Sequence, residues 1–175
     1  MIAERFLVLD GSLGFCIVAI VEASDEGRRV VAEDREYRLP LMQRIAAVVP
    51  DERSRLALTG VVVGTGPGSF TSIRLAASTA AGIAAALRIP LRTSDSDVAV
   101  LEAVGRAFSM SLGVRESIEV TSAGSELRAR GDGSPPVGED ESAEVVAMSL
   151  VRHSKPESGR IALRYLAPAR GAADR

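Results

Sequence analysis

Short apolar runs alternate along the chain with longer segments in which apolar residues recur at helical spacing. Residues 6–9 form the first run, closed by Asp10-Gly11-Ser12, and residues 15–21 form a second run rich in Val and Ile. Continuous runs between turn residues predict buried strands, whereas helical recurrence predicts helices. The strands predicted in this way are 6–9, 15–21, 28–37, 60–63, 89–92, 115–121, 126–130 and 161–166. The predicted helices are 41–49, 69–87, a segment that begins at Ser94 or Ser96 and runs to about Phe108, and 142–151.

The character of the chain changes near Gly113. Before this residue, predicted strands and helices are mixed, as in an α/β protein. After it, two weakly alternating strands are flanked by Gly, Ser and Pro, and residues 131–140 have the composition of a mobile loop. We therefore expect an N-terminal lobe over residues 1–108 and a reduced C-terminal lobe over residues 109–175.

Composition narrows the possible functions. A chain of 175 residues with 46% hydrophobic content can form one core and a small second lobe. The formal net charge is −2 and aromatic residues make up 3%, so tight binding of RNA by this chain alone is disfavoured. Cys16 and His153 are the only residues of their types, which excludes a disulfide framework and a Cys/His zinc cluster. With no apolar run of about 18 residues and no signal-peptide pattern, we expect a cytoplasmic protein without membrane contact.

A glycine-rich loop, residues 64–68, follows the predicted strand 60–63. Glycines let backbone N–H groups converge, and the start of the next helix favours negative charge, so such a loop is a common but unspecific anion site. No Gly-Lys-Ser/Thr follows and the spacing is G-x-G-x-G, which excludes a P-loop and a Rossmann fingerprint. Candidate phosphate-facing residues are Asp10, Ser12, Gly64, Gly66, Gly68, Ser69, Thr71 and Arg74.

Residues 62–75 read VVGTGPGSFTSIRL, which resembles the G-x-G-P-G-S-F-T-G-[LI]-R-[IV]-G hallmark of the TsaB (YeaZ) family. Residues 6–12, 39–49 and 82–91 resemble neighbouring segments of that family, and residues 164–168 resemble its Tyr-Leu-Arg-x-Pro end. The resemblance is close over residues 5–105 and loose afterwards, where the second lobe is shorter. Three residues depart from the family pattern: Gly11 for Thr, and Ser72 and Ala76 for Gly.

The resemblance implies the actin-like ATPase (ASKHA) fold and a non-catalytic subunit that binds and supports a TsaD-like enzyme. That enzyme threonylcarbamoylates the adenosine next to the anticodon of tRNAs, a TsaE-like ATPase joins the complex, and the subunit is a homodimer when alone. It implies tRNA contact only through the complex, with no cofactor and no metal. In the family, pairing uses two helices of the N-terminal lobe, which match residues 41–49 and 69–87. The corresponding partner-binding candidates are Leu41, Ile45, Val48, Ala77, Ala80, Ala81 and Ala84.

Two other functions stay open on the sequence. The chain could be a nucleotide-dependent enzyme that uses residues 64–69 with Asp10, or a stand-alone homodimeric scaffold. The alanines could equally pack only against the protein's own sheet. Arg74 fits a phosphate, a partner carboxylate or solvent equally well. We expect His153 to complement a helix C-terminus and Cys16 to be inert core.

Overall fold

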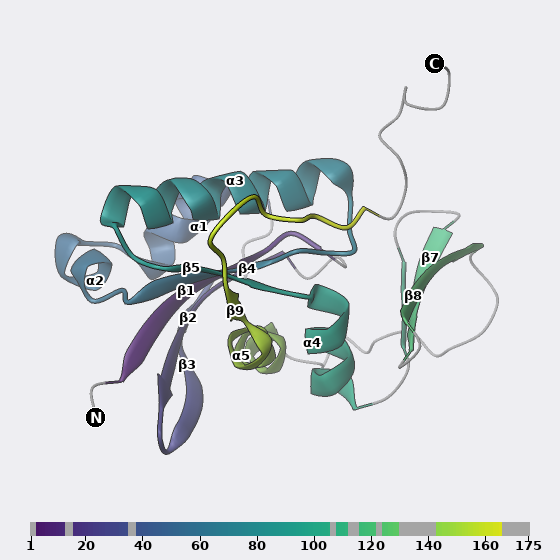
Figure 1. Ribbon diagram of the computed structural model, residues 1–175, viewed down its shortest axis with the longest axis horizontal. Helices are drawn as coiled ribbons and strands as arrows, with labels where there is room; N and C mark the ends of the chain where they lie inside the picture. Colours follow the sequence, from purple (N-terminus) through teal and green to yellow (C-terminus); the bar gives the residue numbers. More distant parts are fainter. Residues whose placement is uncertain are drawn as a thin grey trace.

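A six-stranded mixed sheet forms the centre of the computed structural model (Figure 1), in the order β3-β2-β1-β4-β5-β9. Strands β1, β4 and β5 are parallel to one another, while β2 and β3 extend the sheet as antiparallel neighbours on one side and β9 on the other. The bounds are β1 Glu4–Asp10, β2 Ile17–Ser24, β3 Gly27–Glu33, β4 Gly60–Gly64, β5 Leu91–Ser94 and β9 Lys155–Pro156. The structure describes residues 3–12, 16–34, 38–105, 108–111, 116–121, 124–129 and 143–165.

Both faces of the central strands are buried. In β1, Leu7 and Leu9 contribute to one core cluster while Phe6 and Val8 contribute to the other, as the two-residue period of a strand requires. The same division recurs in β4, where Val61 lies in the first cluster and Val62 in the second. This explains why these strands are continuous apolar runs in the sequence rather than alternating patterns.

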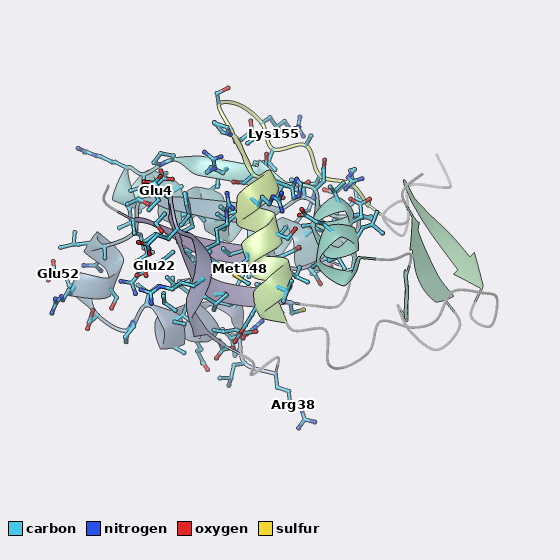
Figure 2. The ribbon with its side chains drawn as sticks, turned by 90° about the horizontal axis from the view of Figure 1, so that it is seen from below. Glu4, Glu22, Arg38, Glu52, Met148 and Lys155 are labelled. Atoms are coloured by element: carbon cyan, nitrogen blue, oxygen red, sulfur yellow. The ribbon has the colours of Figure 1, made fainter. Side chains whose placement is uncertain are left out.

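Helices cover the two faces (Figure 1). Helices α1 Leu41–Val48 and α3 Phe70–Leu87 pack against one core cluster, and α4 Ser96–Val104 and α5 Ala143–His153 pack against the other. Figure 2 shows the face of the sheet that α4 and α5 cover, with α5 and its Met148 in front of the sheet. The short α2 Glu52–Leu56 follows α1.

The ends of α3 follow from local chemistry. The Ser69 hydroxyl caps its start by accepting the backbone N–H of Ser72 at 3.2 Å. The helix ends at Leu87, and the next residue, Arg88, has a left-handed φ of 54° that turns the chain toward β5. By contrast, α1 begins after Pro40 without a side-chain cap.

Most predicted elements are confirmed, with corrections at the boundaries. The structure adds α2, β6 Phe108–Ser111 and β9, which the sequence did not predict. Helix α4 ends at Val104 rather than near Phe108 because Gly105 turns the chain at φ 72°. The predicted strand 161–166 is wrong over residues 161–165, which make only an isolated bridge from Tyr165 to Gly68. The loop 131–140 lies outside the described residues.

Strands β6, β7 Glu116–Thr121 and β8 Gly124–Ala129 form a separate antiparallel sheet. They belong to the predicted C-terminal lobe, as do α5 and β9. However, α5 packs on the main sheet and β9 pairs with β5, so these two elements complete the N-terminal core. The division into two lobes at residue 108 stays a prediction.

Candidate functional site

The carboxyl ends of β1, β4 and β5 meet at one edge of the main sheet. Asp10 ends β1, Gly64 ends β4 and Ser94 ends β5, and Gly64 lies directly opposite Ser94 in the parallel register. Ligands of α/β proteins bind at this edge, so the residues gathered here form the candidate site.

Asp10 is buried at this edge, with 3% of its surface exposed. One carboxylate oxygen accepts the backbone N–H of Ser12 at 2.8 Å. Burial raises the pKa of Asp10 and the nearby charge of Asp97 raises it further, against the hydrogen bonds from Ser12 and Ser96 that lower it. Gly64 packs so closely that a Cβ there would lie 2.2 Å from the Asp10 Cγ. Only glycine therefore fits beside this carboxyl group.

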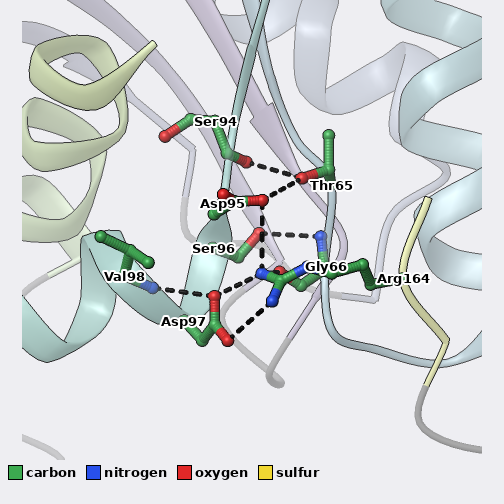
Figure 3. Close-up of polar contacts among 8 residues, drawn as sticks. All are labelled: Thr65, Gly66, Ser94, Asp95, Ser96, Asp97, Val98 and Arg164. Atoms are coloured by element: carbon green, nitrogen blue, oxygen red, sulfur yellow. Dashed lines mark hydrogen bonds and ion pairs between the residues drawn. The ribbon is translucent and has the colours of Figure 1, made fainter. Parts of the chain in front are cut away.

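The turn from β5 into α4, residues 94–96, makes hydrogen bonds to the polar groups of the glycine-rich loop (Figure 3). The backbone N–H of Thr65 donates to the Ser94 carbonyl at 2.9 Å, and the N–H of Gly66 donates to the Ser96 hydroxyl at 3.2 Å. The Thr65 hydroxyl reaches both the Ser94 carbonyl and Asp95 Oδ1 at 3.1 Å. The N–H groups that an incoming phosphate would need at these two positions already have acceptors within the chain.

Arg164 closes the loop from the other side (Figure 3). Its Nη2 donates to the Gly66 carbonyl at 2.7 Å, its Nη1 donates to Asp97 Oδ2 at 3.0 Å, and its backbone N–H donates to the Thr65 carbonyl at 2.9 Å. Asp95 lies 3.4 Å from the same guanidinium. Burial alone would lower the pKa of Arg164, but the hydrogen bonds and charge of Asp97 and Asp95 outweigh it and raise the pKa.

Arg164 belongs to a segment, residues 157–165, that we call the C-terminal strap. It follows β9 and runs along the α3 side of the sheet, where Ile161 and Leu163 pack on the core (Figure 1). At its end the Tyr165 hydroxyl accepts Arg74 Nε at 3.1 Å, and the Tyr165 ring lies 5.0 Å from that of Phe70. The strap therefore fastens the glycine-rich loop to the start of α3.

The predicted phosphate-facing residues divide into two groups. Asp10, Ser12, Gly64 and Gly66 are buried together at the sheet edge, and Gly68 bridges to the strap. Among the described residues, the buried Ser12 hydroxyl makes no hydrogen bond of regular geometry, although it lies close enough to Asp10 to lower the pKa of that carboxyl group. The other group lies at the start of α3, where Ser69 is the helix cap, Thr71 is exposed, and Arg74 stacks on Phe70 with its Cζ 4.1 Å from the ring centre.

Sequence reasoning missed the acidic and cationic half of this site. The sequence alone does not mark Asp95, Asp97 or Arg164 as site residues, and it marks Ser94 and Ser96 only as candidate starts of a helix. No local pattern connects Arg164 to Asp97, because 67 residues separate them. The one available signal was the resemblance of residues 164–168 to the family's C-terminal segment.

Most of the predicted partner-binding residues lie in the chain's own core. Five of them are buried there, namely Ile45, Val48, Ala77, Ala80 and Ala84, whereas Leu41 and Ala81 are half-buried. Other residues of the same helices, and Leu39 just before α1, are exposed and face outward. We call this surface the α1–α3 face, and it includes Leu39, Met42, Ala46, Leu75, Ser78 and Gly82. Any contact that α1 and α3 make with another protein has to use these outward residues.

A cavity of about 160 Å³ opens between the first turns of α1 and α3, next to Asp10. Its lining includes exposed Leu39 and Leu75, with Cys16 and Arg44 deeper. Arg44 is buried, pairs with Asp34 at 2.6 Å and donates to the Cys16 carbonyl at 2.7 Å. Burial raises the pKa of the Cys16 thiol, which keeps it in the unreactive protonated form at neutral pH.

The side chain of His153 lies between two helices. His153 ends α5, where its Nε2 contacts Glu102 of α4, so it links two helices rather than only facing its own helix terminus. Hydrogen bonds from Ser149 and His153, together with the charges of His153 and Arg152, lower the pKa of Glu102.

In the part of the chain that the structure describes, no cluster of His, Cys, Asp and Glu could hold a metal. Helix α3 is long and apolar enough to span a membrane by composition alone, a test that core helices also pass.

Comparisons with known proteins agree with the resemblance. Residues 34–108 match the family model described as TsaD: tRNA N6-adenosine threonylcarbamoyltransferase. A crystal structure of an uncharacterized protein with similarity to peptidase YeaZ, from Pseudomonas aeruginosa, is 18% identical with a TM-score of 0.54, over 77% of this chain and 71% of that one. YeaZ from Pseudomonas aeruginosa is 16% identical with a TM-score of 0.45, over 75% of this chain and 66% of that one. No curated protein matched. The family resemblance of the sequence is thus confirmed, by the TsaD family match of residues 34–108 and by a fold like that of the YeaZ-like structure.

Proposed function

We propose that this chain is a non-catalytic subunit that binds a TsaD-like enzyme and supports threonylcarbamoylation of the adenosine next to the anticodon of tRNAs. The family match over residues 34–108 supports a place in this modification system. In this proposal the chain acts in the cytoplasm, a TsaE-like ATPase joins the complex, and tRNA is contacted through the complex.

The closed glycine-rich loop carries the non-catalytic part of the proposal. The N–H groups of Thr65 and Gly66 have internal acceptors, and the Arg164 guanidinium holds the loop carbonyls. The carboxyl groups of Asp10, Asp95 and Asp97 lie around the same loop and would repel a phosphate. A nucleotide would have to displace the strap before it could bind there.

An enzymatic function is the second candidate, favoured by the family description itself and by buried Asp10 with its neighbour Ser12 at the carboxyl edge. The two functions separate in a reconstitution. With the TsaD and TsaE homologues of the same organism, the chain should be required for modification of tRNA. Alone it should neither hydrolyse ATP nor modify tRNA, whereas ATP turnover by the pure chain that Asp10→Asn abolishes would establish the enzymatic function instead.

The α1–α3 face is the proposed contact surface. Met42 is 60% exposed and Leu75 52%, so a charge at either position leaves the isolated chain folded but would be buried without a partner in a complex. We expect Met42→Arg and Leu75→Arg to lose the TsaD homologue on a sizing column while their Tm stays within about 3 °C of wild type. Val145→Arg, on the opposite face of the sheet, is the matched control and should still bind.

A further inference from the structure

A second cavity, of about 260 Å³, opens where β3, α4 and α5 meet, on the face of the sheet that Figure 2 shows. Ala103 of α4, with Val145 and Met148 of α5, forms its apolar wall. Val145 is 42% exposed, so this wall faces solvent. The side chains of Arg28 and Arg152 also line the cavity, which therefore combines apolar surface with cationic groups.

The carboxylate in this cavity is already used within the chain. Glu102 Oε2 accepts the Ser149 hydroxyl at 2.7 Å and contacts His153 Nε2, while its Oε1 pairs with Arg152 Nη1 at 2.7 Å. These groups of α5 lower the pKa of Glu102, so the carboxyl group stays ionised at neutral pH. The other acidic residue of α5, Glu144, does not line the cavity. The charges of Glu102 and Arg152 therefore neutralise each other within the protein.

Arg28 carries a charge that the described part of the chain does not compensate. Its side chain is exposed and forms no ion pair with a described residue, although Asp25 and Glu26 line a neighbouring hollow with it at the β2–β3 turn. The next residue, Arg29, differs because it pairs with Glu22 at 2.6 Å and does not line the cavity. One guanidinium group is thus left for a ligand, next to an apolar wall.

We propose that this cavity binds a small organic anion, a carboxylate on a compact apolar body, with the carboxylate paired to Arg28 and the body against Val145 and Met148. A guanidinium group matches the two oxygens of a carboxylate, and small-molecule sites combine apolar walls with a few polar groups. An apolar cavity of about 150 Å³ takes a benzene ring, so about 260 Å³ accommodates a ring and its carboxylate.

This ligand site is independent of the proposed function. It lies on the face of the sheet opposite α1 and α3, and it shares no residue with the glycine-rich loop or the strap. Failure of the following experiment would therefore leave the proposed function standing.

Benzoate is the probe, and nuclear magnetic resonance of the full chain is the measurement. Benzoate should shift the amide signals of residues around the cavity in a saturable way, with a Kd in the millimolar range. Benzamide has the same ring without the charge, and acetate has the charge without the ring, so each should bind at least about fivefold more weakly. Equal affinities for benzoate and benzamide, shifts confined to other parts of the chain, or no saturation up to about 50 mM would each overturn the proposal.

Two neighbouring arginines provide a matched pair of variants. Arg28→Gln should weaken benzoate binding at least about fivefold, whereas Arg29→Gln should leave it unchanged because Arg29 lies outside the cavity. Both side chains are exposed, so both variants should keep the amide spectrum of the folded protein. An Arg28→Gln protein that binds benzoate like wild type would overturn the assignment. Tighter binding of acetyl-Ala-Leu with a free C-terminal carboxylate would overturn a free small molecule as the occupant, in favour of a protein C-terminus.

Discussion

Replacing Arg164 with alanine tests the closed site most directly. The change leaves the Asp97 carboxylate buried without its cation and removes one donor from the Gly66 carbonyl, which keeps its bond from the backbone N–H of Ser96. Breaking a buried ion pair costs about 3–5 kcal/mol and an exposed one about 0–1 kcal/mol. The Arg164 side chain is 45% exposed while that of Asp97 is 6% exposed, so an intermediate cost of about 2 kcal/mol applies. The lost hydrogen bond to Gly66 adds about 1 kcal/mol.

The total of about 3 kcal/mol corresponds to a fall in Tm of about 6–12 °C for a chain of this size. Thermal unfolding followed by circular dichroism measures it directly. Arg160→Ala is the matched control, because Arg160 is exposed on the same strap, and its Tm should stay close to wild type. Arg164→Lys keeps the charge but loses the two-pronged contact with Asp97, so its Tm should fall between the two.

A double substitution separates charge from packing. If the cost comes from the uncompensated carboxylate, Asp97→Asn should restore part of the stability that Arg164→Ala removes. An Arg164→Ala protein that melts within about 1 °C of wild type would refute the reasoning, because the strap would then not hold the loop through this contact. A double variant less stable than both single variants would show that packing, rather than charge, carries the effect.

Three further substitutions test two residues at this edge of the sheet and one in α3. Gly64→Ala should destabilise the protein by about 3 kcal/mol or more, because the added Cβ would overlap the Asp10 carboxyl group. Gly82→Ala should instead raise stability by about 1 kcal/mol, because a Cβ at this position in α3 meets no atom within 4 Å. Urea titration measures the free energy of unfolding of both variants. Because burial raises the folded-state pKa of Asp10, its ionisation weakens the fold as pH rises from its ordinary value of 3.8 through the folded pKa. At pH 7 the Asp10→Asn variant should therefore have a higher Tm than the wild type, and below pH 3.8 the two proteins should have the same Tm. A wild-type Tm above that of the variant at pH 7 would contradict this reasoning.

The sequence predicted the central elements because their signals are local. The buried strands β1, β2 and β4 are continuous apolar runs in the sequence. Helix α3 is a long uninterrupted apolar segment that directly follows its capping residue Ser69. Helix α2 has five residues, too few for a periodic pattern, although its Asp51 cap on Ser54 was a readable signal. The strand predicted at 161–166 shows the limit of such reasoning, since β9 already pairs with the edge of β5.

The candidate site was predicted only where its residues are close in the chain. The turn at Asp10 and the glycines at 64–68 stand out as local motifs. In contrast, Asp97 and Arg164 meet only after the sheet and the strap are in place, and neither residue is unusual in its own segment. Helical spacing identified α1 and α3, but it could not tell that Ala80 faces the sheet while Leu75 faces outward.

The strap also has a consequence for the order in which the protein is made. Arg164 reaches back over 98 positions to the Gly66 carbonyl, so the first parallel strands and their loop are synthesised long before the residue that completes them. A nascent chain that has not yet reached Arg164 holds Asp97 without its cation and Thr65 without the donor for its carbonyl. The fold is therefore completed only after the strap has been synthesised, well after the strands of the main sheet.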